Sequence, residues 1–460
     1  MMREPAFSLL SPPRALSLQG RKVLVLGLGD TGLSVARWVA SEGGAVRVAD
    51  TRADPPRRKD FAGEFHGGGF DVSLLKEIDL VCISPGISLE EEIVRAAVAK
   101  GIPVAGDIEL FAWAVRGRSR SQVAAITGTN GKSTVTALTG HLLRSAGADS
   151  EVAGNISPPA LEALARRKAP PSAWVLELSS YQLETTWSLA PDAAALLNLS
   201  EDHLDRYAGI DEYAAAKARV FQGAGVQVLN RDDPRSMACA VPGREVFTFG
   251  LQVPLKESDF GIAASGFLVK GGTKILDARE LPIHGAHNVS NALAACALAH
   301  ALGTPTEALA AGLRSFKGLP HRLERVALRR GVAWYDDSKG TNVGATVAAL
   351  AGLQVKTVLI LGGEGKGQDF SPLAPAVRTH ARKVLLIGRD AALIEKAIAV
   401  TGVPLEHCRS MGEAVEKAAA CAQPGDAVLL SPACASFDMF RDYAHRGEAF
   451  ARAVRSLGDG

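Results

Sequence analysis

The stretch Ala125–Thr134, AITGTNGKST, contains the strongest local signal in the sequence. A short apolar run leads into the turn Gly128–Ser133, and an amphipathic helical pattern (VTALTGHLL) follows. Glycines let backbone N–H groups approach an anion, the new helix adds its dipole, Lys132 supplies a positive charge, and Ser133 offers a ligand to magnesium. The spacing departs from the standard P-loop, whose first glycine would fall at Ile126. The stretch predicts a nucleoside triphosphate site, and a structural strand-to-helix turn is the alternative.

Short apolar runs like the one before Gly128 recur along the chain and alternate with helical patterns. They are too short for helices and mostly apolar on both faces, which is typical of buried parallel strands. Alternation of strand and helix over this length predicts an α/β fold with crossover helices. The runs are Lys22–Leu26, Val46–Ala49, Leu80–Ile83, Val123–Ile126, Trp174–Leu178, Ala193–Leu197, Thr357–Leu361, Lys383–Ile387 and Ala427–Leu430.

Two breaks divide this pattern into three α/β units, about 1–111, 112–318 and 319–460. The first break, Arg116–Ser121 (RGRSRS), favours a solvated linker over a phosphate-binding patch, because blocks of like charge are usually exposed. The second, Lys317–Pro320 (KGLP), follows Ala-rich helical patterns, and glycine followed by proline ends a helix there. At roughly 150 residues per domain, the length of 460 residues also predicts about three domains.

The composition is that of a folded protein without an excess of charge. Hydrophobic residues make up 47%, charged residues 22%, and the formal net charge is +2, which argues against a protein that mainly neutralises nucleic-acid phosphates. No apolar run approaches the roughly 18 residues needed to span a bilayer, and the N-terminal stretch is a poor signal peptide. Six cysteines without a CxxC pair indicate neither a disulfide framework nor a zinc site. We therefore expect a cytoplasmic protein with no nucleic-acid partner and no membrane insertion.

A second glycine-rich turn, Gly27–Gly32 (GLGDTG), fits the GxGxxG pattern after a strand. Asp50 ends the next strand, close to the expected spacing of about 20 residues, where it could reach a ribose hydroxyl. The pattern is short, and it equally suits another diphosphate, such as a nucleotide sugar, or a tight turn. A dehydrogenase would also need a site for hydride transfer, and no His/Asp or Cys constellation accompanies the turn. The turn therefore predicts a diphosphate site of undetermined nucleotide.

Charged residues follow two predicted strands of the central unit. Glu177 ends an apolar strand, where a buried carboxylate would need a counter-charge such as a magnesium ion shared with Ser133; an exposed strand end is the alternative. Glu201–Arg206 (EDHLDR) follows the next strand, and this cluster favours a site at the carboxyl end of the sheet. Lys217 lies in a helical pattern and by itself predicts a solvated surface lysine.

The last part of the chain carries several polar loops. Asn288 and Asn291 lie at the start of an apolar helical pattern, where N-capping is the default role and a purine contact is the alternative. Loops at the carboxyl ends of parallel strands meet at one edge of the sheet, which suits a small carboxylate-bearing substrate; scattered caps and turns are the alternative. The polar clusters are His321–Arg322 at the unit boundary and, each after an apolar strand, Asp337–Asn342, Gly362–Gly367 and Ser431–Ser436.

In this order and spacing, the stretches resemble the Mur ligase family of ATP-dependent amide-forming enzymes. The motifs that carry the resemblance span nearly the whole chain: GTNGKST (128–134), ELSSYQLE (177–184), NLSEDHLDRY (198–207), AAK (215–217), HNVSNALAA (287–295), GLPHRLE (318–324) and DDSKGTN (336–342). DDSKGTN, together with SPGIS (84–88), GGEGKGQDF (362–370) and SPACASFDMF (431–440), most resembles the members that add D-glutamate to UDP-N-acetylmuramoyl-L-alanine. The DNPR-type motif of the diaminopimelate-adding relatives is not found.

The resemblance implies an α/β protein of three domains. Residues 1–111 would form a Rossmann-like domain that binds the UDP-sugar, and 112–318 a central P-loop-type ATPase domain with a mostly parallel sheet. Residues 319–460 would form a Rossmann-like domain that binds the amino acid. The resemblance assigns the GLGDTG turn to UDP rather than NAD. It also implies that Lys217 is carbamylated by carbon dioxide, which turns a cation into a carboxylate-like ligand and reverses the expectation of a solvated lysine.

The resemblance implies roles for residues in all three domains. The catalytic residues would be Lys132, Glu177, His203 and Lys217, and two magnesium ions would be held by Ser133, Glu177, His203 and carbamylated Lys217. Contacts with ATP would come from Gly128, Thr129, Asn130, Gly131, Lys132, Ser133, Thr134, Asn288, Asn291, Arg322 and Asp337. Contacts with the UDP-sugar would come from Gly29, Asp30, Thr31, Asp50, Thr51, Ser84 and Asn155. Further substrate contacts would be His203 and, for D-glutamate, Lys339, Thr341, Lys366, Ser436 and Tyr443.

The implied reaction is the ATP-dependent addition of D-glutamate to UDP-N-acetylmuramoyl-L-alanine through an acyl phosphate, which releases ADP and phosphate during peptidoglycan precursor synthesis. A monomer is expected. Three alternatives stay open. One is a ligase of the same fold with another acceptor, such as a folylpolyglutamate synthase. The others are a nicotinamide oxidoreductase built on the GLGDTG turn and a nucleotide-binding module without catalysis.

Overall fold

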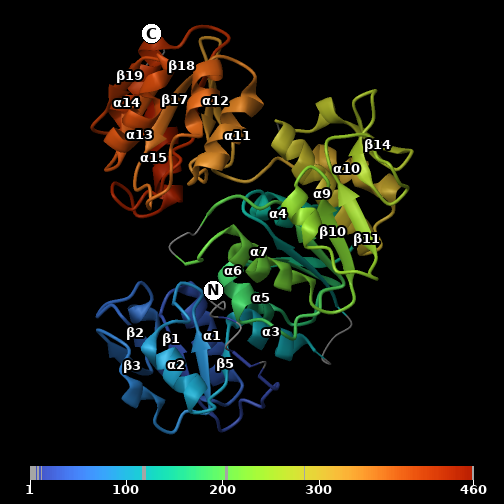
Figure 1. The fold of residues 1–460 in the computed structure, drawn as a ribbon, viewed down its shortest axis with the longest axis vertical. Coiled ribbons are helices and arrows are strands. Elements are labelled where there is room, and N and C mark those ends of the chain that lie inside the picture. Colours follow the sequence, from blue (N-terminus) through green and yellow to red (C-terminus); the bar gives the residue numbers. More distant parts are fainter. Residues whose placement is uncertain are drawn as a thin grey trace. The chain divides into compact units, whose positions relative to one another are not determined.

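Three β-sheets organise the part of the chain that the computed structural model describes (Figure 1). Helices flank each sheet, and the predicted α/β fold of three domains is confirmed. The residues described are 7, 10–11, 13–116, 121–202, 206–283 and 285–457.

The chain divides into two compact units, Met1–Asp277 with Ala292–Leu313 and Ala278–Asn291 with Arg314–Gly460. The first unit contains two of the sheets and the second unit contains the third. The domain boundaries expected near residues 111 and 318 stay predictions, and most of the expected linker, at 117–120, lies outside the described residues. Of the helices described, none combines the length and the apolar character needed to cross a bilayer.

The first sheet is parallel, with the order β3 (Glu64–Gly67), β2 (Ala45–Asp50), β1 (Lys22–Leu26), β4 (Leu80–Ile83), β5 (Val104–Ala105). β1 and β4 match the predicted runs to the residue, because KVLVL and LVCI are apolar on both faces and almost wholly buried. The chain steps from β1 outward to β3 and then returns to β4 on the other side. The strand order therefore reverses between β1 and β4, and open α/β sheets bind ligands outside the carboxyl ends of the strands at such a reversal. The helices are α1 (Asp30–Ser41), α2 (Glu92–Ala99) and α3 (Asp107–Val115).

The second sheet has the order β14 (Thr273–Asp277), β13 (Phe267–Lys270), β12 (Phe260–Ile262), β11 (Val246–Phe249), β10 (Val226–Asn230), β9 (Ala193–Leu196), β6 (Gln122–Thr127), β8 (Ala173–Glu177), β7 (Ser150–Gly154). The strands from β7 to β12 in this order are parallel, and β13 and β14 add an antiparallel edge. Because β6 lies between β8 and β9, the loops after these three strands meet at one edge. The helices are α4 (Lys132–Ser145), α5 (Ala160–Arg166), α6 (Ser180–Glu184), α7 (Ile210–Ala218), α8 (Pro234–Ala238), α9 (Ala286–Ala301) and α10 (Leu309–Ser315).

The third sheet has the order β15 (Glu324–Arg329), β16 (Val332–Asp336), β20 (Ala427–Leu430), β17 (Thr357–Gly362), β18 (Ala381–Ile387), β19 (Leu405–His407). It is parallel except for the β15–β16 hairpin. The polar loops after β16, β20 and β17 therefore end at the same edge, as the sequence predicts. The helices are α11 (Val343–Leu353), α12 (Leu373–His380), α13 (Ala391–Ile398), α14 (Met411–Cys421) and α15 (Tyr443–Ser456).

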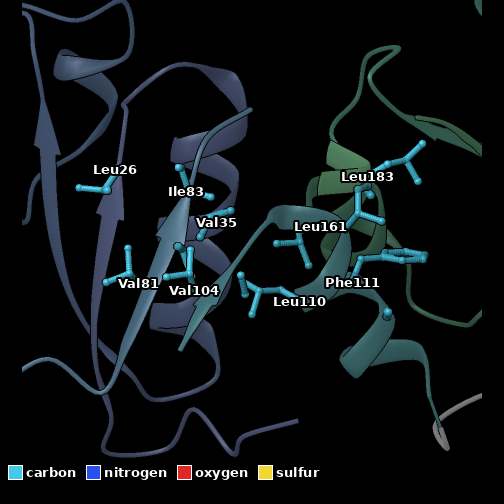
Figure 2. Packing of buried hydrophobic residues seen from close by; sticks show 14 of the residues in the cluster. Leu26, Val35, Val81, Ile83, Val104, Leu110, Phe111, Leu161 and Leu183 are labelled. Atoms are coloured by element: carbon cyan, nitrogen blue, oxygen red, sulfur yellow. The ribbon is translucent and has the colours of Figure 1, made fainter. Parts of the chain in front are cut away.

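Helix α3 joins the first and second sheets in one hydrophobic core (Figure 2). Its Leu110 and Phe111 are buried, and Figure 2 shows Leu110 on the side of the first sheet, toward Val104, and Phe111 on the side of the helices that carry Leu161 and Leu183. The ring of Phe111 also meets Trp174 edge-on, with ring centroids 5.1 Å apart. Burial of apolar surface stabilises a fold by about 25 cal/mol per Å². The buried side chains of α3 therefore help to hold the first two domains together.

Two buried carboxylates of α3 add polar contacts at this junction. Glu109 accepts hydrogen bonds from the backbone N–H of Trp187 at 2.7 Å and from the hydroxyl of Ser188 at 2.6 Å. Asp107 accepts a hydrogen bond from the side-chain amide of Gln182 at 3.0 Å. Burial raises the pKa of Asp107 to about 6, although the Gln182 hydrogen bond acts in the opposite direction. Both acids thus bind loop and helix groups of the central domain.

Candidate active site

The predicted phosphate loop, Gly128–Gly131, connects β6 to α4 at the carboxyl edge of the second sheet. Gly131 has φ +85° and Gly128 has φ +151°, which are conformations that favour glycine. A Cβ atom on Gly128 would also lie 3.0 Å from the Cβ of Leu197. The two glycines are therefore required by the turn itself, and the strand–loop–helix context of a phosphate loop is present.

Residues after β9 hold this loop in place. The backbone N–H of Asn130 donates to Oδ1 of Asn198 at 2.8 Å, and Nδ2 of Asn198 donates to the carbonyl of Asn130 at 3.0 Å. The N–H of Thr129 donates to the carbonyl of Asn198 at 2.9 Å. Asn198, the first residue of the NLSEDHLDRY motif, thus fixes the conformation of the neighbouring GTNGKST loop.

Lys132 lies across the loop. Its Nζ donates to the carbonyl oxygens of Gly128 at 3.0 Å and Thr129 at 2.9 Å. Phosphate oxygens entering the loop could replace these carbonyls as acceptors. Ser133 and Thr134 are buried in the first turn of α4, where the helix dipole favours an anion.

Glu177 ends β8 and is 2% exposed, which excludes the exposed strand end that the sequence leaves open. Nδ2 of Asn155 donates to its Oε1 at 2.7 Å. Its Oε2 is buried and accepts no hydrogen bond from the residues that the structure describes. A buried carboxylate oxygen without a partner is costly, and a divalent cation would satisfy it. Asn155, predicted to contact the sugar, thus lies against the carboxylate of Glu177.

Lys217, in α7, is 2% exposed, so the solvated lysine predicted from the pattern alone is wrong. Its Nζ donates to Oγ1 of Thr127 at 3.3 Å and lies 4.6 Å from the centroid of the Tyr213 ring. Burial lowers the pKa of Lys217 well below its ordinary value, and the charge of Lys132 lowers it further, whereas two nearby carboxylates act in the opposite direction. This amine therefore gives up its proton more readily than a surface lysine.

Lys132, Glu177 and Lys217 gather at one edge of the second sheet. Glu177 lies opposite Ile126 in the β6–β8 register, and Lys217 reaches Thr127, the last residue of β6. The remaining predicted catalytic residue, His203, belongs to the segment 203–205, which lies outside the described residues. Two lysines and an acidic group thus surround the phosphate loop, an arrangement suited to holding polyphosphate and a metal ion.

The second predicted turn, Gly27–Gly32, connects β1 to α1. A Cβ atom on Gly32 would lie 1.9 Å from the carbonyl oxygen of Gly27, so the absence of a side chain lets α1 pack against β1. A Cβ atom on Gly29 would meet nothing within 4 Å, so this residue borders open space that a diphosphate could enter. The hydroxyl of Ser84 donates to the carbonyl of Gly27 at 3.2 Å and links the loop after β4 to the turn.

Asp50, at the end of β2, is 1% exposed, and its carboxylate binds the protein itself. The N–H of Leu28 donates to Oδ2 at 2.7 Å, and the guanidinium of Arg52 donates to both oxygens at 2.8 Å. Burial would raise the pKa of Asp50, but the hydrogen bonds from Arg52 and Leu28 outweigh it and lower the pKa to about 2. The other predicted UDP contacts near this edge, which are exposed or half-buried, are Asp30, Thr31 and Thr51.

In the second compact unit, Asp337 lies directly after β16 at the edge of the third sheet. It accepts hydrogen bonds from the hydroxyl of Ser431 at 2.7 Å and from the backbone N–H of Leu323 at 3.2 Å. Burial raises the pKa of Asp337 to about 7, although the Ser431 hydrogen bond and the charge of Arg322 act in the opposite direction. The predicted ATP contacts Arg322 and Asp337 thus lie close enough for the charge of Arg322 to act on the carboxyl of Asp337.

The predicted D-glutamate contacts lie on the loops that follow three adjacent strands. Nζ of Lys339 lies 3.8 Å from the centroid of the Tyr443 ring, a cation–π contact. Thr341 is half-buried in the same loop, Ser436 is buried in the loop after β20, and Lys366 is exposed in the loop after β17. Positive charge and hydroxyl groups therefore gather at this edge, which suits a dicarboxylate.

Asn288 and Asn291 lie inside α9, which begins at Ala286. N-capping, the default role in the sequence, is therefore wrong for both residues. Nδ2 of Asn291 donates to Oδ1 of Asn288 at 3.2 Å. The pair belongs to the second compact unit, and its contact with a purine stays a prediction.

Arg446, in α15, supports the site and was not identified from the sequence. It is 1% exposed, and its guanidinium donates to the hydroxyl of Ser338 at 2.9 Å and to the carbonyl of Cys434 at 3.0 Å. Arg446 thereby joins the loops after β16 and β20, and burial lowers its pKa to about 10. Its spacing from Phe450 and Val454, both buried on the same helix, is the signal that places it on the inner face.

Comparison with known families covers most of the chain. Residues 21–106 match the Mur ligase MurD-like N-terminal domain, 126–299 match the Mur ligase middle domain, and 321–434 match the Mur ligase glutamate ligase domain. These ranges contain the two glycine-rich turns and the loops after β16 and β17, and they end within the loop after β20.

Individual relatives match over almost the full length. The UDP-N-acetylmuramoylalanine–D-glutamate ligase of Nitrosospira multiformis is 56% identical over 96% of this chain and 97% of its own, and that of Thiobacillus denitrificans is 54% identical over 96% and 98%. Among solved structures, the UDP-N-acetylmuramate–alanine ligase of Thermotoga maritima has a TM-score of 0.60 at 18% identity, over 95% of this chain and 100% of its own. A pseudomurein peptide ligase type C of Methanothermus fervidus has a TM-score of 0.59 at 19% identity, over the same shares. With its sequence motifs, its three α/β sheets and relatives above 50% identity in agreement, the chain belongs to the Mur ligase family.

Proposed function

We propose that the chain is an ATP-dependent ligase that adds D-glutamate to UDP-N-acetylmuramoyl-L-alanine and releases ADP and phosphate. The observation that carries the proposal is the gathering of Lys132, Glu177 and Lys217 around the phosphate loop. The names of the two bacterial relatives support this choice of donor and acceptor. The product is a peptidoglycan precursor, and we expect the chain to act as a monomer in the cytoplasm.

Activation of the substrate carboxylate is the chemical problem that ATP would solve. A carboxylate is a poor acyl donor, because its oxygen is a bad leaving group. Transfer of the γ-phosphoryl group to the L-alanyl carboxylate would give an acyl phosphate, with Lys132 and the backbone N–H groups of Gly128–Ser133 holding the β- and γ-phosphates. The amine of D-glutamate would then attack the carbonyl carbon, so that a C–N bond forms, the C–O bond to phosphate breaks, and the amine loses a proton.

Two magnesium ions fit the acidic side of this site. Ser133, Glu177, His203 and carbamylated Lys217 would hold them. Oε2 of Glu177, which accepts no hydrogen bond within the described part of the chain, is an oxygen of the kind that a hard cation prefers. Magnesium, when bound, would neutralise charge between the phosphates and the attacking carboxylate.

The surroundings of Lys217 favour its carbamylation. Carbon dioxide reacts with the neutral form of an amine, and burial next to Lys132 favours that form. A carbamate would also replace the repulsion between the two lysines by attraction. The buried site of Lys217, which is costly for a cation, is therefore well suited to a carbamate that faces Lys132 and a metal ion.

Substrate binding would use the other two sheet edges. Gly29 borders open space at the Gly27–Gly32 turn. The diphosphate would contact Gly29, Asp30, Thr31 and Ser84, and the remaining UDP-sugar contacts would be Asp50, Thr51 and Asn155. D-Glutamate would bind Lys339, Thr341, Lys366, Ser436 and Tyr443. Its two carboxylates match the two lysines and the hydroxyl groups on these loops.

An amino-acid screen tests the proposal. Phosphate release is measured with ATP, UDP-N-acetylmuramoyl-L-alanine and each amino acid in turn. We expect D-glutamate to be the best acceptor, ahead of L-glutamate by on the order of 100-fold in kcat/KM. Release that requires a folate and L-glutamate would instead support a folylpolyglutamate synthase. Binding of NADH without phosphate release would support an oxidoreductase, and ATP binding without release in any mixture would support a non-catalytic module.

The phosphate loop is tested by K132A. Loss of the lysine charge from the loop is expected to reduce phosphate release by roughly 1,000-fold. The unfolding midpoint is measured beside the kinetics, so that loss of activity in a folded variant is distinguished from unfolding. The surface variant K100A, at the end of α2, is the control and should keep full activity. Unchanged phosphate release in K132A would remove this loop from the chemistry.

A further inference from the structure

Three loops at the edge of the third sheet carry the residues proposed to bind D-glutamate. They follow the adjacent strands β16, β20 and β17 and contain Lys339 and Thr341, Ser436, and Lys366, respectively. A bound dicarboxylate would need these side chains at fixed separations, yet each loop is attached to a different strand. The contacts that hold the loops to one another therefore decide how well the pocket is formed before the substrate enters.

The side-chain amide of Gln368 binds all three loops at once. Its Oε1 accepts a hydrogen bond from the N–H of Val343, at the end of the first loop, at 3.1 Å. Its Nε2 donates to the carbonyl of Ala433, in the loop after β20, at 2.7 Å, and to the carbonyl of Gly365, in its own loop, at 3.0 Å. One half-buried amide thus joins the ends of three strands through one accepted and two donated hydrogen bonds.

The two carbonyls that Gln368 binds lie beside strained positions of the backbone. Lys366, which follows Gly365, has φ +53°, and Ala433 has φ +56°; both values lie in the left-handed region that disfavours residues with a side chain. Gly365 is held on its other side, where its N–H donates to Oδ2 of Asp390 at 2.6 Å. Gln368 and Asp390 therefore hold Gly365 by hydrogen bonds to its carbonyl and its N–H. They thereby restrict the backbone direction at Lys366, the next residue.

We propose that Gln368 is a positioning residue that sets the affinity for D-glutamate by holding Lys366 at a fixed place relative to Lys339 and Ser436. It acts through Lys366 and does not touch the substrate. The inference rests on the proposed function, because it takes the D-glutamate contacts from it. A residue that preorganises a pocket reduces the entropy that its side chains and loops lose when the substrate binds. Loss of Gln368 should therefore raise the KM for D-glutamate and not the KM values of the other two substrates.

The test compares Q368M and Q368E with the matched control Q354M. Methionine keeps the length of the side chain but makes none of the three hydrogen bonds, and glutamate places a carboxylate against two carbonyl oxygens. Gln354 is exposed at the far end of α11 from the loops. For Q368M and Q368E we expect the KM for D-glutamate to rise at least tenfold, kcat to fall less than threefold, and the KM values for ATP and the UDP-sugar to stay within twofold. Q354M should match the wild type in all four values.

Three outcomes would overturn the positioning role. They are an unchanged KM for D-glutamate in Q368M, an equal rise in the KM of all three substrates, and a fall of more than 10 °C in the melting temperature, which would mark Gln368 as a general structural residue. The double variant K366A/Q368M tests whether Gln368 acts through Lys366. When Lys366 is already absent, Q368M should change the KM for D-glutamate by less than twofold. If the wild-type chain itself does not use D-glutamate, the proposed function fails instead, and the two failures are distinguished.

Discussion

At the scale of single residues, burial decides the chemistry of Lys217. A lysine that is 2% exposed, next to Lys132 and under the ring of Tyr213, cannot keep its charge as a surface lysine does. Such a site is unfavourable for the ammonium form of Lys217 and suits the anionic carbamate that its neutral amine would form with carbon dioxide. The phosphate loop, Glu177 and Lys217 therefore form one electrostatic unit, and a change at one member affects the charge balance of the others.

The K217A variant tests this unit. Without the amine no carbamate can form, and the metal ligand that it would provide is lost, so we expect activity to fall by at least about 100-fold. Millimolar bicarbonate or a short carboxylic acid should restore part of it by supplying a carboxylate in the vacated space. The measurement is phosphate release with and without the added acid, and K100A is the control. Full activity of K217A without rescue would end the carbamate proposal.

The pH dependence of stability tests the role of Asp50. Its pKa is about 2 in the folded chain and 3.8 in the ordinary carboxyl, so the stability that it contributes is present above pH 4 and is lost as the pH falls toward 2. We expect D50N to lower the free energy of unfolding at pH 7 by about 1–2 kcal/mol, allowing for solvent screening of the exposed Arg52. The difference should shrink by pH 3 in urea unfolding.

The exposed neighbour variant D54N is the control for Asp50 and should follow the wild type at both pH values. Equal destabilisation of D50N at pH 7 and pH 3 would rule out this role of Asp50. At pH 3 the unfolded chain binds a proton at Asp50, whose ordinary pKa is 3.8, whereas the folded carboxylate with its pKa of about 2 does not, so part of the stability that Asp50 contributes is already lost.

Local chemistry explains which site residues could be predicted from the sequence. The GTNGKST and GLGDTG turns are predictable because their glycines meet backbone constraints within a few residues, as at Gly131 and Gly32. The burial of Lys217 and Arg446 depends on which face of a helix packs inward, and a polar residue in a helical pattern is exposed by default. The three-loop contact of Gln368 depends on strand order in the third sheet, which the local pattern does not determine.

At the scale of elements, the contact of α1 with β1 provides a matched pair of glycine variants. In G32A the added Cβ would lie 1.9 Å from a backbone oxygen, so α1 must move away from β1; in G29A it would meet nothing within 4 Å. We expect G32A to lower stability by about 1–3 kcal/mol, with loss of UDP-sugar binding. G29A should remain as stable as the wild type but raise the KM for the UDP-sugar several-fold.

Thermal melting and kinetics of the two glycine variants separate the roles of these positions. A stable G32A with normal kinetics would contradict the close packing of α1 on β1. A G29A variant with an unchanged KM for the UDP-sugar would show that the diphosphate does not approach Gly29.

Strands differ in how far their sequences predict them. The parallel strands β1, β4 and β20 match their predicted runs to the residue, because both faces are buried and their sequences are continuously apolar. The antiparallel strands β13 and β14 are not predicted, since they are short and carry polar residues. Their place in the sheet is set by pairing, β13 with β12 and β14 with β13. Helix α9 begins two residues before Asn288, which shifts the asparagines from the cap into the helix.

At the scale of the whole molecule, α3 couples the first and second domains. Glu109 is 0% exposed and accepts hydrogen bonds from Trp113, Trp187 and Ser188, so E109A would take the acceptor from several partly buried donors. We expect a loss of about 3 kcal/mol or more in the free energy of unfolding, measured in urea. The exposed variant E92A, in α2, should change stability by less than about 0.5 kcal/mol. Equal stability of E109A and the wild type would contradict a polar junction at α3.

In the proposed reaction, ATP activates the L-alanyl carboxylate of the UDP-sugar for capture by D-glutamate. Substrate labelled with oxygen-18 in the L-alanyl carboxylate tests this activation, because an acyl phosphate transfers one carboxylate oxygen to the departing phosphate. We expect one labelled oxygen in each phosphate released during turnover with D-glutamate, as read by mass spectrometry. Unlabelled phosphate, released while the amide product forms, would rule out the acyl phosphate.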